Sequence, residues 1–524
     1  MTKRKLLKLM VKEAMVPNFS INKTLANFAI NLAATGFDDS RCGNLVNDSR
    51  QVQANDVFAA IVGTQQDASQ FITAAIAQGA SVVIRQCDEA SMHGHVEYQQ
   101  SNRAPVPVVS FYQLADKLHQ VSAHYYQMPS NDLTMIGVTG TNGKTSCCHL
   151  LAQLFTANQA KSAIIGTLGA GPLDDLQDVN NTTPGPTLLQ QLLLGFKQQG
   201  ISNVAMEVSS HALAQKRLDA NMIDIAVFTN LSRDHLDYHG DMQSYARAKQ
   251  KLFVKNSDQR WVINGDDAVG RQWLEQDDVC NDTLVYGLEQ SISALPAKLY
   301  VCADNVKCHQ AGISFNVHSS FGHCHIDSSL LGKFNVSNLL AVISVALSSG
   351  VGIDEMPSLV QQLQSVAGRM ELFSAHGKAS AVVDYAHTPD GLEQALRSAR
   401  QHCQGKLWVV FGCGGDRDKG KRPMMGAIAE QFADHIVLTN DNPRSESAEQ
   451  ITDDIAAGIK DLSNTQVIID RQQAVLTTLA KANAKDMVLL AGKGHEDYLI
   501  IGEQTIAYNE REVVRQFYTQ GDAR

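Results

Sequence analysis

The chain contains 524 residues, of which 44% are hydrophobic and 19% charged; this is typical of globular proteins and leaves room for about three domains. Its formal net charge of -10 argues against nucleic acid or an anionic membrane surface as a partner. The ten cysteines include no CxxC pair, and no apolar run approaches the roughly 18 residues of a membrane-spanning helix. We therefore expect a cytoplasmic protein with reduced thiols and no membrane span, and we expect it to be a monomer.

Residues 1–130 carry the pattern of a small α/β domain. Apolar runs at 56–63, 81–84 and 106–109 predict buried strands, and the run at 71–79 predicts a helix that ends at a glycine. The polar turns in this region are equally compatible with ordinary loop chemistry.

The segment 137–145 reads Gly-Val-Thr-Gly-Thr-Asn-Gly-Lys-Thr and joins an apolar run to a helical pattern. A glycine-rich turn before a helix N-terminus binds phosphate through backbone N–H groups and the helix dipole. Lys144 is placed to reach the terminal phosphates of ATP, and the Thr145 hydroxyl to ligate Mg²⁺. Val138 stands where the strict pattern has glycine, so an ordinary glycine-rich turn is the alternative. The predicted ATP-binding residues are Gly140, Thr141, Asn142, Gly143, Lys144, Thr145 and Ser146.

Residues 131–354 alternate strands and helices around this loop, which predicts a mainly parallel sheet. Glu207 and His235 follow two apolar runs of this region, at the sheet edge where ligands bind. They are candidate metal ligands, although a surface ion pair and a loop cap are the simpler alternatives. Lys249 lies beside an apolar helical stripe, where burial favours the neutral amine that reacts with CO₂; a solvated lysine is the alternative.

Residues 355–524 predict a third, Rossmann-like α/β domain. Four polar clusters follow its apolar runs, at 384–389, 414–422, 441–444 and 492–496, and we expect them to form one pocket. Arg417 and Arg444 suit bidentate recognition of a carboxylate.

Taken together, these motifs resemble those of the Mur ligases, the ATP-dependent amino-acid ligases of peptidoglycan synthesis and cell-wall biogenesis. The resemblance rests on the segments 139–145, 181–184, 207–211, 230–237, 245–253, 368–371, 384–387 and 441–444. It implies a three-domain α/β fold with domains at 1–130, 131–354 and 355–524, which bind a UDP-sugar, ATP and an amino acid in that order.

The resemblance also implies residue roles. Lys144 acts with Mg²⁺ on the migrating phosphoryl group, Thr145, Glu207 and His235 face the metal together with a carbamylated Lys249, and His387 helps to hold the nucleotide. The UDP-sugar residues are Ser49, Thr64, Gln65, Gln66, Asn181, Thr182, Thr183, Ser209, Gln215 and Arg217. The amino-acid residues are Arg417, Asp441, Asn442, Pro443, Arg444, Gly492 and Glu496.

The choice of amino acid follows from the segment Asp441-Asn442-Pro443-Arg444, which is the version found in diaminopimelate-adding members of the family. Diaminopimelate carries one carboxylate more than lysine, and Arg444 offers it a rigid donor fork. The implied reaction joins diaminopimelate to the D-glutamyl γ-carboxylate of UDP-N-acetylmuramoyl-L-alanyl-D-glutamate through an acyl phosphate. Alternatives are a lysine-adding ligase, a folylpolyglutamate synthetase, and a nucleotide-dependent switch that hydrolyses ATP without ligation.

Overall fold

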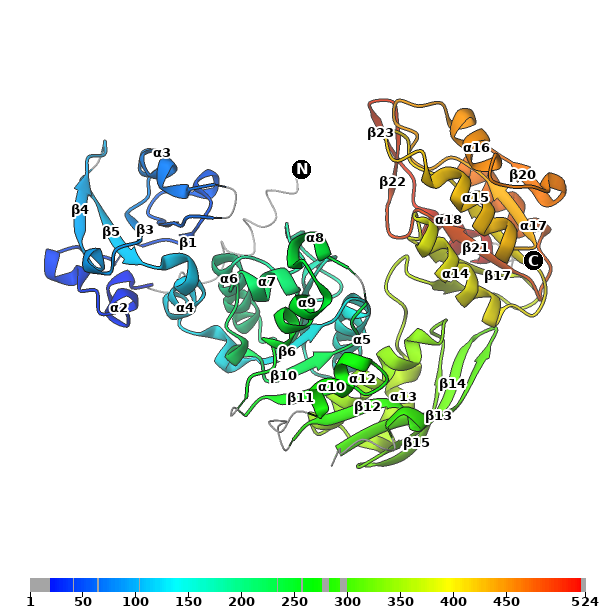
Figure 1. Cartoon of the computed structure of the whole chain (residues 1–524), viewed down its shortest axis with the longest axis horizontal. Helices are drawn as coiled ribbons and strands as arrows, with labels where there is room; N and C mark the ends of the chain where they lie inside the picture. The colour runs from blue at the N-terminus through cyan, green and yellow to red at the C-terminus, as the bar shows by residue number, and fades with distance from the viewer. Residues whose placement is uncertain are drawn as a thin grey trace. The chain divides into compact units, whose positions relative to one another are not determined.

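A computed structural model of the protein (Figure 1) describes residues 19–40, 42–63, 66–102, 104–232, 234–255, 258–275, 282–292 and 299–519. The chain divides into two compact units. The first holds residues up to Ile263 together with Asp267–Thr283, and the second holds Asn264–Asp266 together with the residues from Leu284 onward.

The first sheet of the first unit has the strand order β1-β2-β3-β5-β4, and only β4 runs antiparallel to its neighbour. Its elements are α2 (Ile21–Ala26), β1 (Leu45–Val46), β2 (Val57–Ala60), α3 (Ile72–Gln78), β3 (Val82–Cys87), β4 (Val96–Gln99), β5 (Val106–Tyr112) and α4 (Leu114–Tyr125). Alternate residues of β2 enter two cores, because side chains of a strand alternate between its faces. Val57 packs with α2 and α4, and Phe58 packs with α3. Gly79 ends α3 with a φ of 112°, as the sequence predicted.

The second sheet of this unit is built around β6 (Thr134–Thr139), which lies between β9 (Asn203–Glu207) and β10 (Ile225–Phe228) and runs parallel to both. Its other elements are α5 (Lys144–Ala157), β7 (Ser162–Gly166), β8 (Gly169–Gly171), α6 (Pro186–Gln198), α7 (Ser210–Ala214), α8 (Leu236–His239), α9 (Met242–Gln250), β11 (Arg260–Asn264) and α10 (Ala268–Leu274). Since β6, β9 and β10 are parallel, the segments that follow them meet at one edge of the sheet.

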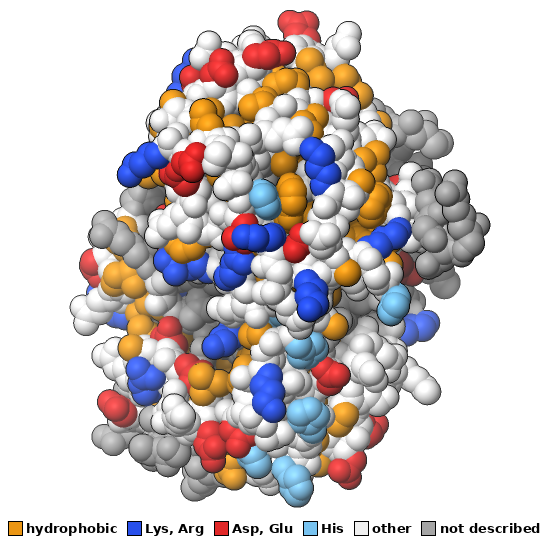
Figure 2. Space-filling view, turned by 90° about the vertical axis from the view of Figure 1, so that its right-hand side faces the viewer, with side chains coloured by type: hydrophobic (Ala, Val, Ile, Leu, Met, Phe, Trp, Pro, Cys, Tyr) orange, Lys and Arg blue, Asp and Glu red, His pale blue; other side chains and the backbone are white. Residues whose placement is uncertain are grey.

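The second unit begins with strands that are mostly antiparallel. Its first elements are β12 (Leu284–Leu288), α11 (Glu289–Ile292), β13 (Leu299–His309), β14 (Gly312–Ser319), β15 (Gly322–Ser328), α12 (Phe334–Ser348) and α13 (Met356–Gln361). β13, β14 and β15 pair antiparallel, an arrangement that the expected mainly parallel sheet did not include. Its signal in the sequence is the period of two in β14, where Ile313, Phe315 and Val317 are buried. Histidine side chains gather near the lower end of the face in Figure 2, and β13, β14 and β15 carry four: His309, His318, His323 and His325.

The last sheet has the strand order β16-β17-β21-β18-β19-β20 and is parallel except for β16. Its elements are β16 (Glu371–Phe373), β17 (Ser380–Asp384), α14 (Pro389–His402), β18 (Leu407–Phe411), α15 (Lys421–Phe432), β19 (His435–Leu438), α16 (Ala448–Ala456), β20 (Thr465–Val467), α17 (Arg471–Lys481), β21 (Met487–Ala491) and α18 (Glu510–Thr519), with the hairpin of β22 (Tyr498–Ile501) and β23 (Gln504–Ala507) beside it. α14, α15 and α16 pack on one face of this sheet, and α17 and α18 on the other. Helices on both faces of a parallel sheet are what the sequence predicted for this domain.

Candidate active site

The predicted phosphate loop joins the end of β6 to the start of α5. Gly140 and Gly143 have φ angles of 153° and 85°, which residues other than glycine rarely adopt. A Cβ on Gly140 would lie 1.9 Å from the Thr229 hydroxyl. Val138, which stands where the strict phosphate-loop pattern has glycine, lies inside β6 and is fully buried. The backbone there is extended and does not require glycine.

Residues after β10 fix the conformation of this loop. The N–H groups of Thr141 and Asn142 donate to the backbone and side-chain oxygens of Asn230, over 2.9 and 3.0 Å. In return, the Thr229 hydroxyl donates to the carbonyl of Asn142 over 2.6 Å. The loop is therefore held from the neighbouring strand, as a preformed anion site requires.

Two lysine amines converge on one carbonyl oxygen of this loop. The Nζ atoms of Lys144 and Lys249 both donate to the Gly140 carbonyl, over 2.9 and 2.8 Å. Lys249 is only 1% exposed, and its Nζ lies 4.6 Å from the ring centroid of Tyr245. Burial, together with the charge of Lys144, lowers the pKa of Lys249 to about 7. The N-terminus of α5 and the Lys144 amine give this loop the positive character that suits a phosphate group.

Glu207, at the end of β9, lies beside Thr145 as the sequence predicted. Its carboxylate accepts hydrogen bonds from the backbone N–H and the hydroxyl of Thr167, over 2.8 and 3.3 Å, and from the Thr145 side chain. Burial raises the pKa of Glu207, against the effect of these hydrogen bonds. Carboxylate and hydroxyl oxygens are the ligands that Mg²⁺ prefers, so Thr145 and Glu207 fit the predicted metal.

His235 is exposed and adopts a left-handed backbone with a φ of 51°. Its ring centroid lies 4.9 Å from that of His211 and 6.1 Å from that of Tyr245. It therefore shares the neighbour Tyr245 with Lys249. In the part of the chain that the structure describes, no three His, Cys, Asp or Glu side chains form a ready metal site.

Four of the predicted UDP-sugar residues form one hydrogen-bonded cluster beside β9. The Thr183 hydroxyl donates to the Glu207 carbonyl over 2.8 Å and accepts from the backbone of Ser209 over 3.0 Å. Arg217 donates to the Thr183 carbonyl over 2.9 Å and to the side-chain oxygen of Gln215 over 2.8 Å. This cluster connects directly to the buried Glu207.

Among the other residues predicted for the UDP-sugar, Asn181 and Thr182 directly precede Thr183 in the chain, and the remaining four lie between residues 49 and 66. The Thr182 hydroxyl lies 3.1 Å from that of Thr167, and Asn181 is exposed. Ser49 begins a short 3-10 helix capped by Asp48, and Gln66 closes a turn through a hydrogen bond with Gly63. Thr64 and Gln65 lie outside the described residues.

Asp441, Asn442 and Glu496 from the amino-acid set meet at one end of the last sheet. The Asn442 amide donates to Glu496 over 3.0 Å. Gly492 approaches Asp441 so closely that a Cβ would lie 2.4 Å from its carboxylate oxygen. The structure thus brings two strand-end loops together, as expected for the edge of a parallel sheet.

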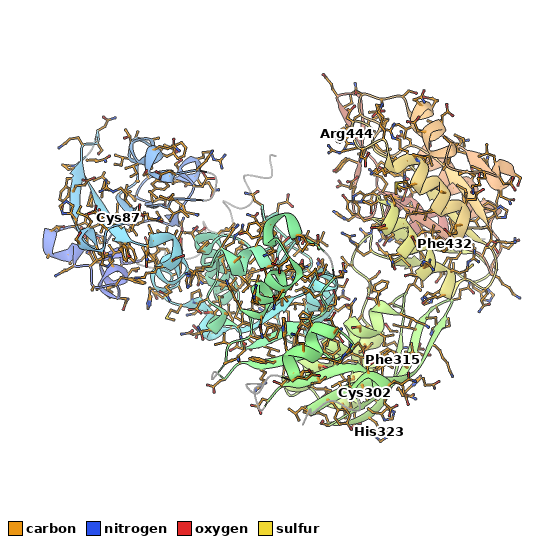
Figure 3. All side chains as sticks on the ribbon, in the orientation of Figure 1. Cys87, Cys302, Phe315, His323, Phe432 and Arg444 are labelled. Carbon is orange, nitrogen blue, oxygen red and sulfur yellow. The ribbon has the colours of Figure 1, made fainter. Side chains whose placement is uncertain are left out.

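Arg417 and Arg444 flank Gly414, where an added Cβ would lie 2.9 Å from Nη1 of Arg444 and 3.7 Å from Cγ of Arg417. Arg444 follows the buried Pro443, has a φ of 52°, and donates to the Gly415 carbonyl over 2.9 Å. Its backbone pairs with Ile501 of β22, and Figure 3 shows Arg444 beside that hairpin. The two predicted carboxylate-binding arginines are therefore neighbours.

His387 is exposed, and its Nδ1 lies 2.8 Å from the Tyr385 carbonyl. The carbonyl of His387 accepts a hydrogen bond from Lys421 over 2.8 Å. These local contacts are compatible with either a structural or a nucleotide-binding role.

Three contact residues were missed by the sequence analysis. Lys493 is fully buried and contacts Asp441, Asn442 and Glu496. The Tyr385 hydroxyl donates to Glu496 over 3.3 Å, and Thr167 donates to Glu207. Lys493 and Tyr385 lie inside polar clusters that the sequence indicated, but only their contacts distinguish them from neighbours. Thr167 stands in no motif and left no signal.

No helix in the described ranges has the length and apolar character needed to cross a membrane. On the face shown in Figure 2, acidic and basic side chains are interspersed.

Comparison with known proteins places the chain. Family models of the Mur ligases match it three times: the catalytic domain model at residues 43–126, the middle domain model at 138–346, and the glutamate ligase domain model at 368–494. The UDP-N-acetylmuramoyl-L-alanyl-D-glutamate–2,6-diaminopimelate ligase of Haemophilus influenzae is 43% identical over 480 residues, which cover 92% of this chain and 97% of that protein.

Two solved structures show the same fold. A UDP-N-acetylmuramoyl-L-alanyl-D-glutamate–2,6-diaminopimelate ligase aligns with a TM-score of 0.71 and 36% identity, covering 92% of this chain and 96% of the other. The UDP-N-acetylmuramoylalanyl-D-glutamyl-2,6-diaminopimelate–D-alanyl-D-alanyl ligase of Acinetobacter baumannii aligns with a TM-score of 0.60 and 17% identity, covering the same shares, and this likeness concerns the fold alone. The chain has the three-domain α/β fold of these enzymes and belongs to the Mur ligase family, whose members are ATP-dependent ligases that form carbon–nitrogen bonds.

Proposed function

We propose that the protein joins meso-2,6-diaminopimelate to the γ-carboxylate of the D-glutamyl residue of UDP-N-acetylmuramoyl-L-alanyl-D-glutamate, with hydrolysis of ATP to ADP and phosphate. The observation that carries this proposal is Arg444, which lies beside Arg417 at Gly414 and donates to the carbonyl of Asn442 over 3.4 Å, while the side chain of Asn442 contacts Glu496. The far end of diaminopimelate carries both a carboxylate and an ammonium group, and this pocket offers charges of both signs. The name of the relative that is 43% identical supports the same substrate.

The reaction has two steps. The γ-carboxylate attacks the terminal phosphorus of ATP, so that an oxygen–phosphorus bond forms, the bond to ADP breaks, and an acyl phosphate results. The amine of diaminopimelate then attacks the acyl carbon and loses a proton, and phosphate leaves as the amide forms. In both steps the enzyme holds the reacting groups together and neutralises their charge.

Lys144 and the backbone N–H groups of the phosphate loop hold the phosphates of ATP in this proposal. Their support is the place of Lys144 at the start of α5, where its Nζ donates to the carbonyls of Gly140 and Thr141 in the loop. Thr145 and Glu207 would hold Mg²⁺, with His235 contributing from the neighbouring loop. When bound, Mg²⁺ neutralises charge on the phosphate oxygens.

Lys249 acts as a carbamate in this proposal. Its neutral amine attacks the carbon of CO₂, a nitrogen–carbon bond forms, and one proton is released, so that a buried cation becomes an anion. The support is its burial at the phosphate loop and a pKa of about 7, which leaves much of the amine neutral near neutral pH.

The UDP-sugar lies against the cluster of Thr183, Ser209, Gln215 and Arg217. The support is that this cluster donates to the Glu207 carbonyl and so adjoins the predicted metal site. The remaining predicted contacts are Ser49, Thr64, Gln65, Gln66, Asn181 and Thr182, and His387 is assigned to the nucleotide.

We also propose domain boundaries at 1–130, 131–354 and 355–524, a cytoplasmic location and a monomeric state. The nine cysteines of the described ranges are free thiols, which supports a reducing compartment. Light scattering of the purified protein measures the oligomeric state.

The decisive experiment is ATP-dependent phosphate release with UDP-N-acetylmuramoyl-L-alanyl-D-glutamate, comparing meso-diaminopimelate with L-lysine at equal concentration. We expect release that requires diaminopimelate, with the amide product confirmed by mass spectrometry. Release with lysine alone would keep the mechanism and overturn the role of Arg444. Release that needs neither amine would instead indicate a nucleotide-dependent switch.

A further inference from the structure

A fully buried lysine lies at the centre of the amino-acid pocket. Lys493, in the loop after β21, has a side-chain exposure of 0%. Its Nζ donates to Glu496 over 2.7 Å, to the side-chain oxygen of Asn442 over 3.1 Å, and to Asp441 over 3.4 Å. The ammonium group thus uses its three donors on three residues of the predicted amino-acid set.

These contacts fix the orientation of the Asn442 amide. Its oxygen accepts from Lys493 and from the backbone N–H of Ile500, the latter over 2.9 Å. Its nitrogen donates to Glu496 over 3.0 Å. If the amide flipped, the two donors, Lys493 Nζ and the Ile500 N–H, would face the NH₂ group, which cannot accept a hydrogen bond. Lys493 therefore helps to hold the Asn442 amide in one orientation.

Lys493 also determines which part of Glu496 is available. One carboxylate oxygen of Glu496 accepts from Lys493 and Asn442, whereas the other accepts from the Tyr385 hydroxyl at a longer distance, 3.3 Å. Burial alone would raise the pKa of Glu496, but the hydrogen bond and charge of Lys493, together with hydrogen bonds from Asn442 and Tyr385, outweigh it and lower the pKa. Glu496 therefore stays ionised, with one oxygen engaged by Lys493 and Asn442 and with further hydrogen bonds from the Tyr385 and Tyr498 hydroxyls to its carboxylate.

Lys493 is too deeply buried to touch a substrate, so its effect on the reaction has to pass through its neighbours. A purely structural ion pair is the simpler explanation for a buried lysine. It does not explain why Lys493 contacts three side chains from two strand-end loops that all belong to the predicted pocket.

We propose that Lys493 is a positioning residue for amino-acid specificity: its ammonium group holds Glu496 and Asn442 in the orientations in which they receive the ammonium end of the incoming amino acid. This inference rests on the proposed function, because it assigns the pocket to an amino acid. It adds a residue that never contacts the substrate.

The test is Lys493→Met, which replaces the side chain with an unbranched, uncharged one that is nearly as long. We expect the KM for diaminopimelate to rise about tenfold or more, as the loss of a charge-assisted hydrogen bond predicts, while the KM for ATP changes less than about twofold. Lys485→Met is the matched control, since Lys485 is an exposed lysine just before β21, and it should leave both constants unchanged.

A combined variant separates positioning from general stabilisation. If Lys493 acts through Glu496 and Asn442, then adding Lys493→Met to Glu496→Gln/Asn442→Ala should raise the KM for diaminopimelate less than about threefold further. Effects that multiply, or a parallel rise in the KM for ATP, would overturn the proposal and leave Lys493 a structural residue.

The same assay tests the proposed function through the wild-type enzyme. If the wild type uses a different amine, the KM for that amine replaces the KM for diaminopimelate in the comparison. If it uses none, crystal structures of the wild type and Lys493→Met decide the positioning claim. Unchanged rotamers of Glu496 and Asn442 in the variant would refute it, and changed rotamers would support it.

Discussion

Lys249 shows how a single residue acquires unusual chemistry from its surroundings. An ordinary lysine is charged at neutral pH, but burial and the nearby Lys144 lower the pKa of Lys249 to about 7. Tyr245 covers the amine from one side and the phosphate loop from the other. The same lysine on the surface would be neither neutral nor close to the phosphates.

Lys249→Ala should lower kcat by about 100-fold or more, because the proposed carbamate would no longer stabilise charge at the metal. Short carboxylates such as acetate or formate should restore part of the activity, since they can occupy the space of the carbamate. Lys251→Ala, two residues along and exposed, is the control and should retain activity. Absence of rescue at any carboxylate concentration would count against the carbamate.

Arg444→Ala should raise the KM for diaminopimelate by about 10- to 100-fold, as expected for the loss of a charge-assisted contact. The KM for ATP should change little, because Arg444 belongs to the proposed amino-acid pocket and not to the phosphate loop. Arg515→Ala is a suitable control, since Arg515 is an exposed residue of α18 paired only with a neighbour on its own helix. An unchanged KM for diaminopimelate in Arg444→Ala would remove the arginine from recognition.

At the scale of elements, α5 combines the phosphate site with a buried histidine. His149, one turn after Lys144, is buried in this helix, and its Nε2 has no hydrogen-bond partner within the described ranges. Burial lowers the pKa of His149 to about 4. Since an unfolded histidine has a pKa near 6.5, the unfolded chain binds more protons than the folded chain between these values.

The contribution of His149 to stability is therefore complete above about pH 6.5 and is lost as the pH falls toward 4, with a total of about 3 kcal/mol. His149→Leu should leave the melting temperature at pH 7.5 equal or higher, and should reduce its fall between pH 7.5 and 5. His323→Leu, which changes an exposed residue at the start of β15 (Figure 3), is the control. Its melting temperature should fall between pH 7.5 and 5 as much as that of the wild type. If the melting temperatures of His149→Leu and the wild type fell equally between pH 7.5 and 5, His149 would have to be protonated or exposed in the folded protein.

At the scale of the whole molecule, stability is divided among several cores. One pair of cores covers the two faces of the first sheet, and another pair covers the two faces of the last sheet. Arg471 and Glu510, both with side-chain exposures of 0%, join α17 to α18 in the second unit. Arg471 also donates to the carbonyls of Asn440 and Ala491, which directly precede Asp441 and Gly492 of the proposed amino-acid pocket.

Calorimetry of this chain should show more than one unfolding transition, as is usual for proteins with several domains. Arg471→Met leaves Glu510 buried without its cation and should destabilise the transition of the second unit by about 3 to 5 kcal/mol. Arg471→Met/Glu510→Leu should recover much of this loss, because no buried charge remains. A single transition that shifts as a whole would show that the units unfold together.

The phosphate loop could be predicted from the sequence because its chemistry is local. Residues Gly140, Gly143, Lys144 and Thr145 are close in the chain, and a strand–turn–helix pattern is enough to place them. The sequence could not predict Thr167, which reaches Glu207 from a different loop, nor the buried position of Lys493. Contacts between distant segments leave no pattern in one sequence, because many side chains at strand ends are polar for other reasons.

The sequence by itself determined the fold class, the family motifs, the ATP loop and the version of the amino-acid segment at 441–444. These features depend on residue types and short spacings, which determine the local backbone structure. Only the tertiary structure decided the burial of Lys249 and Lys493, the antiparallel pairing of β13, β14 and β15, and the neighbouring positions of Arg417 and Arg444. Burial and charge proximity arise when separate strands come together, and they set the pKa values and orientations on which the proposed chemistry depends.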